Sequence, residues 1–284
     1  MSVAYLTNRF PFILFLCIMR AMPIQVRTGS TGFVQLKASF RKNWMHYLQE
    51  ALGLAIFMIS ACFFSVMLYA TGSHWHQVIQ NNFTISMITG LLMGFTALII
   101  FYSPFTAPSG SHINPAVTLT YLRLGKMCRY DALFYIFFQF IGGTIAVYLM
   151  QFVMGNELTD APVRSAVTIP GKAGLWAACA MEFSIAFVTM TIVLFTSASN
   201  QLKRYTRLLA GLLVCLWVIV AGPVSGFGMN PARSFASALP AHIWTAFWIY
   251  LLMPIAGMLG AAELFLWLNS PSPVRFHRHS RFIK

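Results

Sequence analysis

Two nine-residue stretches of this chain follow one pattern: Ser109-Gly110-Ser111-His112-Ile113-Asn114-Pro115-Ala116-Val117 and Ser225-Gly226-Phe227-Gly228-Met229-Asn230-Pro231-Ala232-Arg233. Aligned without gaps, they share Ser, Gly, Asn, Pro and Ala at five of the nine positions. Asn is a favoured helix N-cap, and Pro in the first helical position loses no hydrogen bond. Each copy therefore predicts the start of a short helix, over residues 115–123 and 231–239.

Six apolar windows surround the two copies, and each is long enough for a transmembrane helix of about 20 residues. They are residues 48–70, 85–103, 132–154, 174–196, 208–228 and 244–268. The runs are continuously apolar and lack the alternation of a transmembrane β-barrel. Hydrophobic residues make up 58% of the chain and charged residues 9%, against about 25% charged in an ordinary soluble domain. The sequence therefore predicts an all-α membrane protein with six transmembrane helices.

The two copies occupy equivalent places, because each follows the second helix of a group of three. Three helices per repeat give the halves opposite topology, so the Asn-Pro-Ala segments enter the membrane from opposite faces as re-entrant half-helices. Irregular backbone at that depth must be buried in protein or line a water-filled cavity. We expect a channel domain over 46–268, with repeat 1 at about 46–155 and repeat 2 at about 173–268. A basic N-terminal extension (1–45) and a basic tail (269–284) flank it.

The basic residues are distributed unevenly between the two sides of this topology. Sixteen of the nineteen Lys and Arg residues fall on one side, whereas the opposite loops carry only Arg164 and Lys172. Cytoplasmic loops carry the excess of Lys and Arg, so we expect a multi-pass protein of the cell or plasma membrane with both termini cytoplasmic. The same loops account for the net charge of +13, and we expect no nucleic-acid partner.

The first 45 residues contain one short apolar run, residues 11–19, which ends at Arg20. The run has the apolar core of a signal peptide, but a strongly basic stretch follows it. We expect either a disordered cytoplasmic extension or an upstream start, with true initiation at Met22 or Met45.

The twin boxes, Arg233 directly after the second, and one Glu in each of the first and fourth helices (Glu50 and Glu182) resemble the aquaporin, or major intrinsic protein, family. The resemblance covers about 46–268. It implies a homotetramer of six-helix bundles in which each protomer has its own pore. The pore motifs that it implies are Asn114, Pro115, Ala116, Asn230, Pro231 and Ala232.

The expected mechanism follows from the half-helices, which meet N-terminus to N-terminus and place two positive dipole ends at one point of the pore. The side-chain amides of Asn114 and Asn230 can donate hydrogen bonds to a passing oxygen, whereas a cation or proton meets a positive barrier. We expect Glu50 and Glu182 to bind and orient the re-entrant loops, and His112 to pack beside the first box.

The family's narrow filter has four positions, and counting from the motifs assigns them to Gly94, Val218, Phe227 and Arg233. A slip of one residue would replace Gly94 with Phe95. Strict water channels usually have an aromatic residue and a His at the first two positions, so this filter predicts a wider aperture. We expect a passive channel for water and other small neutral solutes, with glycerol, urea, ammonia and hydrogen peroxide as candidates. Strict water selectivity is the alternative.

Other classes of protein fit the sequence less well. A secondary transporter also uses inverted repeats, but it would need an ion-binding cluster at the midplane, where only Glu50 and Glu182 are available. The five cysteines show no metal-ligand spacing. We therefore expect no enzyme activity, no cofactor and no metal site.

Overall fold

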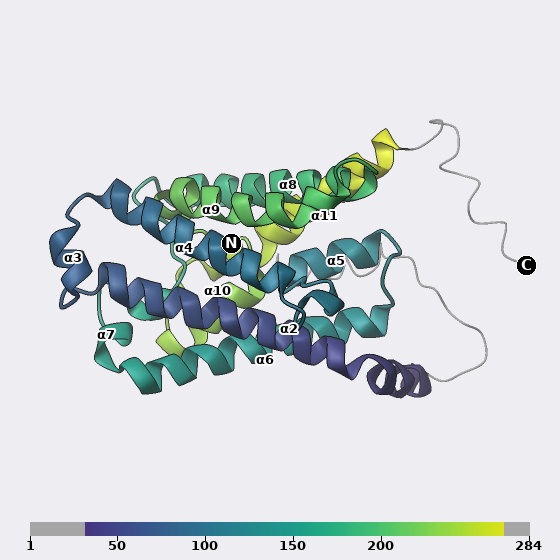
Figure 1. Cartoon of the computed structure of the whole chain (residues 1–284), viewed down its shortest axis with the longest axis horizontal. Helices are drawn as coiled ribbons and strands as arrows, with labels where there is room; N and C mark the ends of the chain where they lie inside the picture. The colour runs from purple at the N-terminus through teal and green to yellow at the C-terminus, as the bar shows by residue number, and fades with distance from the viewer. Residues whose placement is uncertain (1–31, 270–284) are drawn as a thin grey trace, which may run out of the picture.

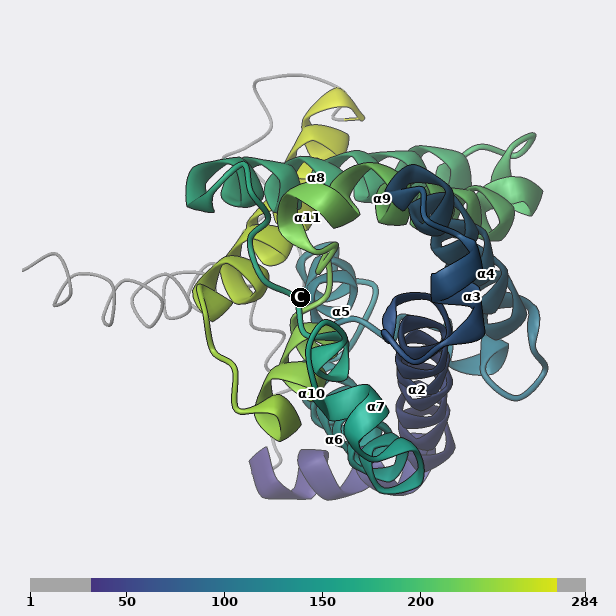
Figure 2. The ribbon, with the colours of Figure 1, turned by 90° about the vertical axis from the view of Figure 1, so that its left-hand side faces the viewer.

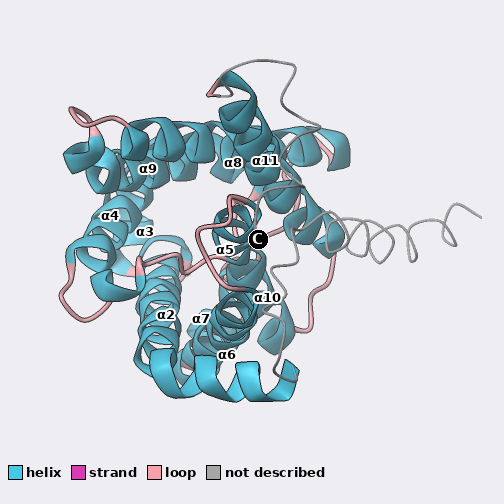
Figure 3. Cartoon of the chain, turned by 90° about the vertical axis from the view of Figure 1, so that its right-hand side faces the viewer, coloured by secondary structure: helices cyan, strands magenta, loops and turns pink. Residues whose placement is uncertain are grey.

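The computed structural model describes residues 32–269, so the remainder of the predicted extension and tail, 1–31 and 270–284, lies outside the described residues. The described part has six helices that are long and apolar enough to cross a membrane, and they run along the long axis of the molecule (Figure 1). They are α2 (Gly32–Tyr69), α4 (Asn82–Tyr102), α6 (Arg129–Met154), α8 (Leu175–Ala198), α9 (Thr206–Ser225) and α11 (Phe247–Leu268). Residues 32–269 contain no strand (Figure 3). The prediction of an all-α, six-helix membrane protein is confirmed.

Two shorter helices, α5 (Pro115–Arg123) and α10 (Pro231–Ala241), begin at the predicted prolines. The end-on views show them inside the ring of long helices (Figures 2 and 3). Each packs against the last long helix of the opposite repeat, α5 on α11 and α10 on α6. The half-helices therefore join the two repeats at the centre of the bundle. The remaining short elements are α3 (His74–Val78), α7 (Asn156–Thr159) and the 3-10 turns η1 (Ala107–Ser109), η2 (Arg164–Ala166) and η3 (Lys203–Tyr205).

Two equivalent glycines allow the closest helix packing in each repeat, between α2 and α6 and between α8 and α11. A Cβ atom on Gly142 would lie 2.2 Å from the carbonyl oxygen of Ala51, and one on Gly257 would lie 2.4 Å from that of Phe183. Any larger residue would push the helices apart. The duplicated contact shows that the inverted repeat extends beyond the sequence motifs into the packing.

The start of α2 differs from the sequence prediction, because the helix begins at Gly32 and not near residue 48. The expectation of a disordered extension is therefore wrong for residues 32–45. In all three views the first turns of α2 run crosswise to the rest of the helix (Figures 1, 2 and 3). They lie at the end of the molecule that we call the basic end, defined by the start of α2, the start of α6 and the loop 199–205 between α8 and α9.

Candidate functional site

The two half-helices start with the same local chemistry. The backbone of Asn114 and Asn230 is extended, and each side chain caps the helix that follows. The side-chain oxygen of Asn114 accepts from the Ala116 N–H at 2.9 Å, and that of Asn230 accepts from the Ala232 N–H at 3.0 Å. These caps satisfy N–H groups that have no partner within a helix. The amide nitrogen of each Asn thereby points away from its own helix.

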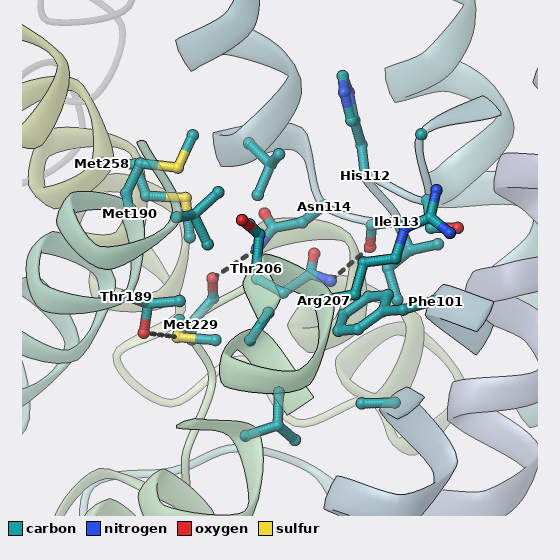
Figure 4. A pocket seen from close by; sticks show the side chains of 18 of the residues that line it. Phe101, His112, Ile113, Asn114, Thr189, Met190, Thr206, Arg207, Met229 and Met258 are labelled. Atoms are coloured by element: carbon teal, nitrogen blue, oxygen red, sulfur yellow. Dashed lines mark hydrogen bonds between the residues drawn. The ribbon is translucent and has the colours of Figure 1, made fainter. Parts of the chain in front are cut away.

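Each of these amide nitrogens donates to the other repeat (Figure 4). Asn114 Nδ2 donates to the Met229 carbonyl at 2.9 Å, and Asn230 Nδ2 donates to the Ile113 carbonyl at 2.6 Å. The residue before each Asn thus accepts from the Asn of the opposite half. An amide nitrogen carries two N–H groups, so each Asn keeps one further donor at the point where the half-helices meet.

Glu50 holds the first re-entrant loop. Its carboxylate accepts from Ser109 Oγ at 2.6 Å, from the backbone N–H of His112 at 2.9 Å, and from that of Ile113 at 2.5 Å. Ile113 has a φ of 41°, in the left-handed region that costs a non-glycine residue free energy. Charge-assisted hydrogen bonds to a buried carboxylate are among the strong ones in proteins. They offset the strain of this loop.

Glu182 holds the second re-entrant loop in the same way. It accepts from Ser225 Oγ at 2.6 Å and from the backbone N–H groups of Gly228 at 2.8 Å and Met229 at 2.6 Å. Met229 also has a positive φ, 48°. Both carboxylates are fully buried. The two acids therefore contact the loops that the sequence analysis expected them to orient.

The surroundings of Glu50 and Glu182 differ in polar contacts that the sequence analysis missed. In the first repeat, Gln139 Nε2 donates to Glu50 at 2.8 Å and to Thr118 Oγ1 at 3.1 Å. The equivalent residue in the second repeat is Pro254, and the hydroxyl of Ser234, which corresponds to Thr118, has no hydrogen-bond partner among the described residues. The available signal for Gln139 was its amide side chain in a mostly apolar window, a signal that it shares with Gln151 of the same helix.

Arg233 lies in the first turn of α10 and is 8% exposed. One guanidinium nitrogen lies 3.5 Å from Ser237 Oγ, and Nε has no hydrogen-bond partner among residues 32–269. Arg233 also interacts electrostatically with Glu182. The equivalent residue in the first repeat is Val117, so the second half alone carries a buried cation beside its carboxylate.

A cavity of about 310 Å³ leads from the basic end to the meeting point of the half-helices. Lys203 and Arg207 line it at the basic end, and Asn114 and Asn230 line it at its inner end. Met190, Met229 and Met258 also line it (Figure 4). Its lining also includes Ala97 and Phe101 of α4, Val193 of α8, Val214 of α9, Phe227 and His112.

His112 is a wall residue of this cavity and not an isolated base. Its ring stacks on Tyr121 with centroids 4.7 Å apart, and its Nδ1 lies 3.2 Å from Thr118 Oγ1. Its backbone N–H donates to the Glu50 carboxylate. His112 therefore packs beside the first box, where the sequence analysis expected it.

The filter position predicted on α4, Gly94, faces a neighbouring helix. A Cβ atom on Gly94 would lie 2.6 Å from Cys215 Cβ and 3.1 Å from the Gly211 carbonyl, so this position faces α9 and not a pore. Phe95, the predicted alternative, is 64% exposed on the outside of the bundle. Residues four apart share a helix face, and Met93 is one turn before the cavity residue Ala97. Met93 is 4% exposed.

The other three predicted filter residues are buried. Phe227 lines the cavity, and Val218 lies one turn beyond the lining residue Val214 on α9. Arg233 is the buried cation described above. Residues 32–269 contain no group of three or more His, Cys, Asp or Glu residues that could hold a metal ion.

The sequence of this chain is similar to those of known proteins. The chain is 34% identical over 149 residues to aquaporin TIP4-2 of Zea mays, covering 52% of this chain and 57% of that protein. It is 31% identical over 179 residues to aquaporin NIP1-2 of Arabidopsis thaliana, covering 62% and 60%. The matches span between about half and three-fifths of the length of these curated relatives.

The fold is similar to that of the aquaglyceroporin from Plasmodium falciparum, with a TM-score of 0.64, 19% identity, and coverage of 78% of this chain and 94% of that one. This likeness concerns the fold alone. The sequence profile of the family described as "Major intrinsic protein" matches residues 37–265, which is most of the chain. The chain therefore belongs to the major intrinsic protein family.

Proposed function

We propose that this protein is a passive transmembrane channel for water and other small neutral solutes, and that it excludes ions and protons. One observation carries the proposal: Asn114 and Asn230 meet at the inner end of a cavity, each with one N–H beyond the hydrogen bond to the opposite repeat. A neutral oxygen can accept from both amides in turn. Since the surrounding wall is mostly apolar, these donors define a narrow polar path.

The same geometry disfavours cations. The N-termini of α5 and α10 converge on this point, and helix N-termini carry partial positive charge. The buried Arg233 adds a full positive charge farther along the chain of the second half-helix. A neutral solute loses little at this point, whereas a cation that has left bulk water finds no acidic side chain among the residues that line the cavity.

The narrowest part of the path is assigned to Met93, Val218, Phe227 and Arg233. Three of these side chains are apolar and one is a cationic donor. Such an aperture suits a small solute that has a hydrocarbon face and a hydroxyl or amine, in addition to water. Glycerol, urea, ammonia and hydrogen peroxide are the candidates, and strict water selectivity is the competing outcome of the test below.

Assembly and orientation complete the proposal. Many large apolar side chains on the outside of the bundle are exposed, among them Leu91, Phe137 and Phe152. Lipid covers part of this surface, and neighbouring protomers of a homotetramer cover the rest. The excess of Lys and Arg at the basic end supports a cytoplasmic location for that end and for both termini.

The test is stopped-flow light scattering on proteoliposomes, with water, glycerol, urea and ammonia compared at equal protein content. Val193 lines the cavity, whereas Val188 of the same helix is 37% exposed on the outside. Val193→Trp should lower the flux of every permeant solute, and Val188→Trp should leave it near the wild-type value. Flux that is equal in both variants, or absent in folded wild-type protein, would refute the channel. Water flux alone would establish the strict water channel.

A further inference from the structure

The start of α2 is longer than a membrane crossing requires. Its 38 residues extend for about 57 Å at 1.5 Å per residue, whereas a bilayer core is about 30 Å thick. The apolar part of the helix ends at Tyr69, so the surplus lies at the basic end. There the first turns run crosswise to the long helices (Figures 2 and 3). Residues 32–45 of this crosswise part are called the N-terminal arm below.

A single carboxylate fixes the N-terminal arm to the bundle. Asp131, in the first turn of α6, accepts hydrogen bonds from Asn43 Nδ2 at 3.0 Å, from the Tyr47 hydroxyl at 2.6 Å and from the Ser39 hydroxyl. The three donors are four residues apart and therefore share one face of α2. Phe40 packs on Phe134 of α6 beside them, with ring centroids 5.2 Å apart. The opposite face of the arm is consequently held outward.

The outward face combines apolar and basic side chains. Phe33 is 73% exposed, Val34 55% and Trp44 46%. Lys37, Arg41 and Lys42 are also exposed, and none of them forms an ion pair with an acidic group of residues 32–269. A helix of this composition, rich in Lys and Arg and carrying aromatic residues, typically lies in the plane of a membrane interface.

The position of the arm relative to the transmembrane helices indicates what it contacts. The arm is continuous with a transmembrane helix, and Asp131 ties it to the first turn of α6, where the next transmembrane helix begins. It therefore lies at the level of the lipid headgroups. Exposed cations of the same end, Lys126 and Arg129, add to its positive charge.

We propose that the N-terminal arm binds the anionic headgroup layer of the leaflet at the basic end. Lys37, Arg41 and Lys42 contact lipid phosphates, while Phe33, Val34 and Trp44 enter the boundary between headgroups and acyl chains. The attraction of basic residues to an anionic leaflet is additive and falls off within a Debye length, so the arm gives the protein a preference for anionic lipid.

The first experiment measures lipid preference with the full chain. Spin-labelled phosphatidylglycerol and phosphatidylcholine are compared in phosphatidylcholine vesicles, and the motionally restricted fraction gives their relative association with the protein. The triple variant Lys37→Gln/Arg41→Gln/Lys42→Gln should lower the preference for phosphatidylglycerol about two-fold, since the other basic residues remain. The control Arg164→Gln/Lys172→Gln removes two exposed cations at the other end and should change it little. An unchanged preference in the triple variant, or an equal loss in the control, would overturn the proposal.

The second experiment tests the apolar side chains and separates a lipid partner from a soluble one. Trypsin cleavage after Lys37 is compared with cleavage after Arg204 of the same chain, in purified phosphatidylcholine vesicles with or without added phosphatidylglycerol. Anionic lipid should slow cleavage after Lys37 relative to Arg204, and Phe33→Gln/Val34→Gln should remove this protection. A cleavage ratio that is the same with and without anionic lipid would overturn the proposal. It would show that the arm is exposed to water and is accessible to a soluble partner.

Discussion

Replacing Glu182 with Gln tests the hydrogen bonds that hold the second re-entrant loop, because it changes one carboxylate oxygen into an amide nitrogen. One carboxylate oxygen accepts from Ser225 Oγ and the Gly228 N–H, and the other accepts from the Met229 N–H. The glutamine amide has one acceptor oxygen, so its nitrogen replaces the second oxygen and faces the Met229 N–H donor to donor. A buried donor without a partner costs about 1–3 kcal/mol.

Two further effects of this substitution oppose each other. The remaining hydrogen bonds lose the strength that a charged acceptor gives them, whereas removing a buried charge relieves its desolvation. The orphaned N–H therefore sets the magnitude. For a domain of this size about 1 kcal/mol corresponds to 2–4 °C in Tm, so Glu182→Gln should lower the apparent Tm by roughly 2–12 °C and reduce the yield of folded protein. Solute ranking per folded molecule should stay the same.

The assay is thermal unfolding in detergent followed by size-exclusion chromatography, with Glu263→Gln as the matched control. Glu263 pairs with Arg123 at 2.7 Å on the surface of the bundle, with its side chain 52% exposed. Exposed ion pairs contribute about 0–1 kcal/mol, so the control should melt close to wild type. If the two variants melt together, Glu182 does not hold the loop. An unchanged yield with an altered solute ranking would instead place Glu182 in contact with the solute.

Further substitutions test the pore and its register. Arg233→Ala should keep water flux but raise proton or cation conductance, measured with a pH-sensitive dye in proteoliposomes; an unchanged leak would remove Arg233 from the filter. Met93→Ala should fold and raise glycerol flux relative to water flux, and no change in that ratio would show that Met93 does not line the aperture. Gly94→Ala should lower the yield of folded protein, because its Cβ would lie 2.6 Å from that of Cys215; normal yield with altered solute selectivity would restore Gly94 to the pore.

The half-helices were predictable because their cause is local. An Asn cap followed by Pro determines where a helix can begin, and α5 and α10 begin at Pro115 and Pro231. The long helices were predictable from apolar length alone. The carboxylates Glu50 and Glu182 were found because each is the only acid in the first apolar window of its repeat.

The direction in which Gly94 faces was not predictable in the same way. The direction of Gly94 depends on how α4 packs against α9, and counting through a loop carries no information about that contact. The N-terminal arm was missed for a different reason. Lys37, Arg41 and Lys42 lower the mean hydropathy of its sequence, so a search for apolar windows excludes a helix that lies at an interface instead of crossing it. Asp131, which joins this arm to α6, was missed with it.

The hydrogen bonds exchanged between Asn114 and Asn230 have a consequence for biosynthesis. The carbonyl that accepts from Asn114 belongs to Met229, 115 residues later in the chain. While the first repeat is being synthesised and inserted, this partner does not yet exist, and neither does α11, against which α5 packs. The first half-helix therefore cannot reach its final position until the last transmembrane helix has entered the membrane. Expressed alone, the first repeat would insert its three long helices and leave residues 103–123 without a stable place in the bilayer.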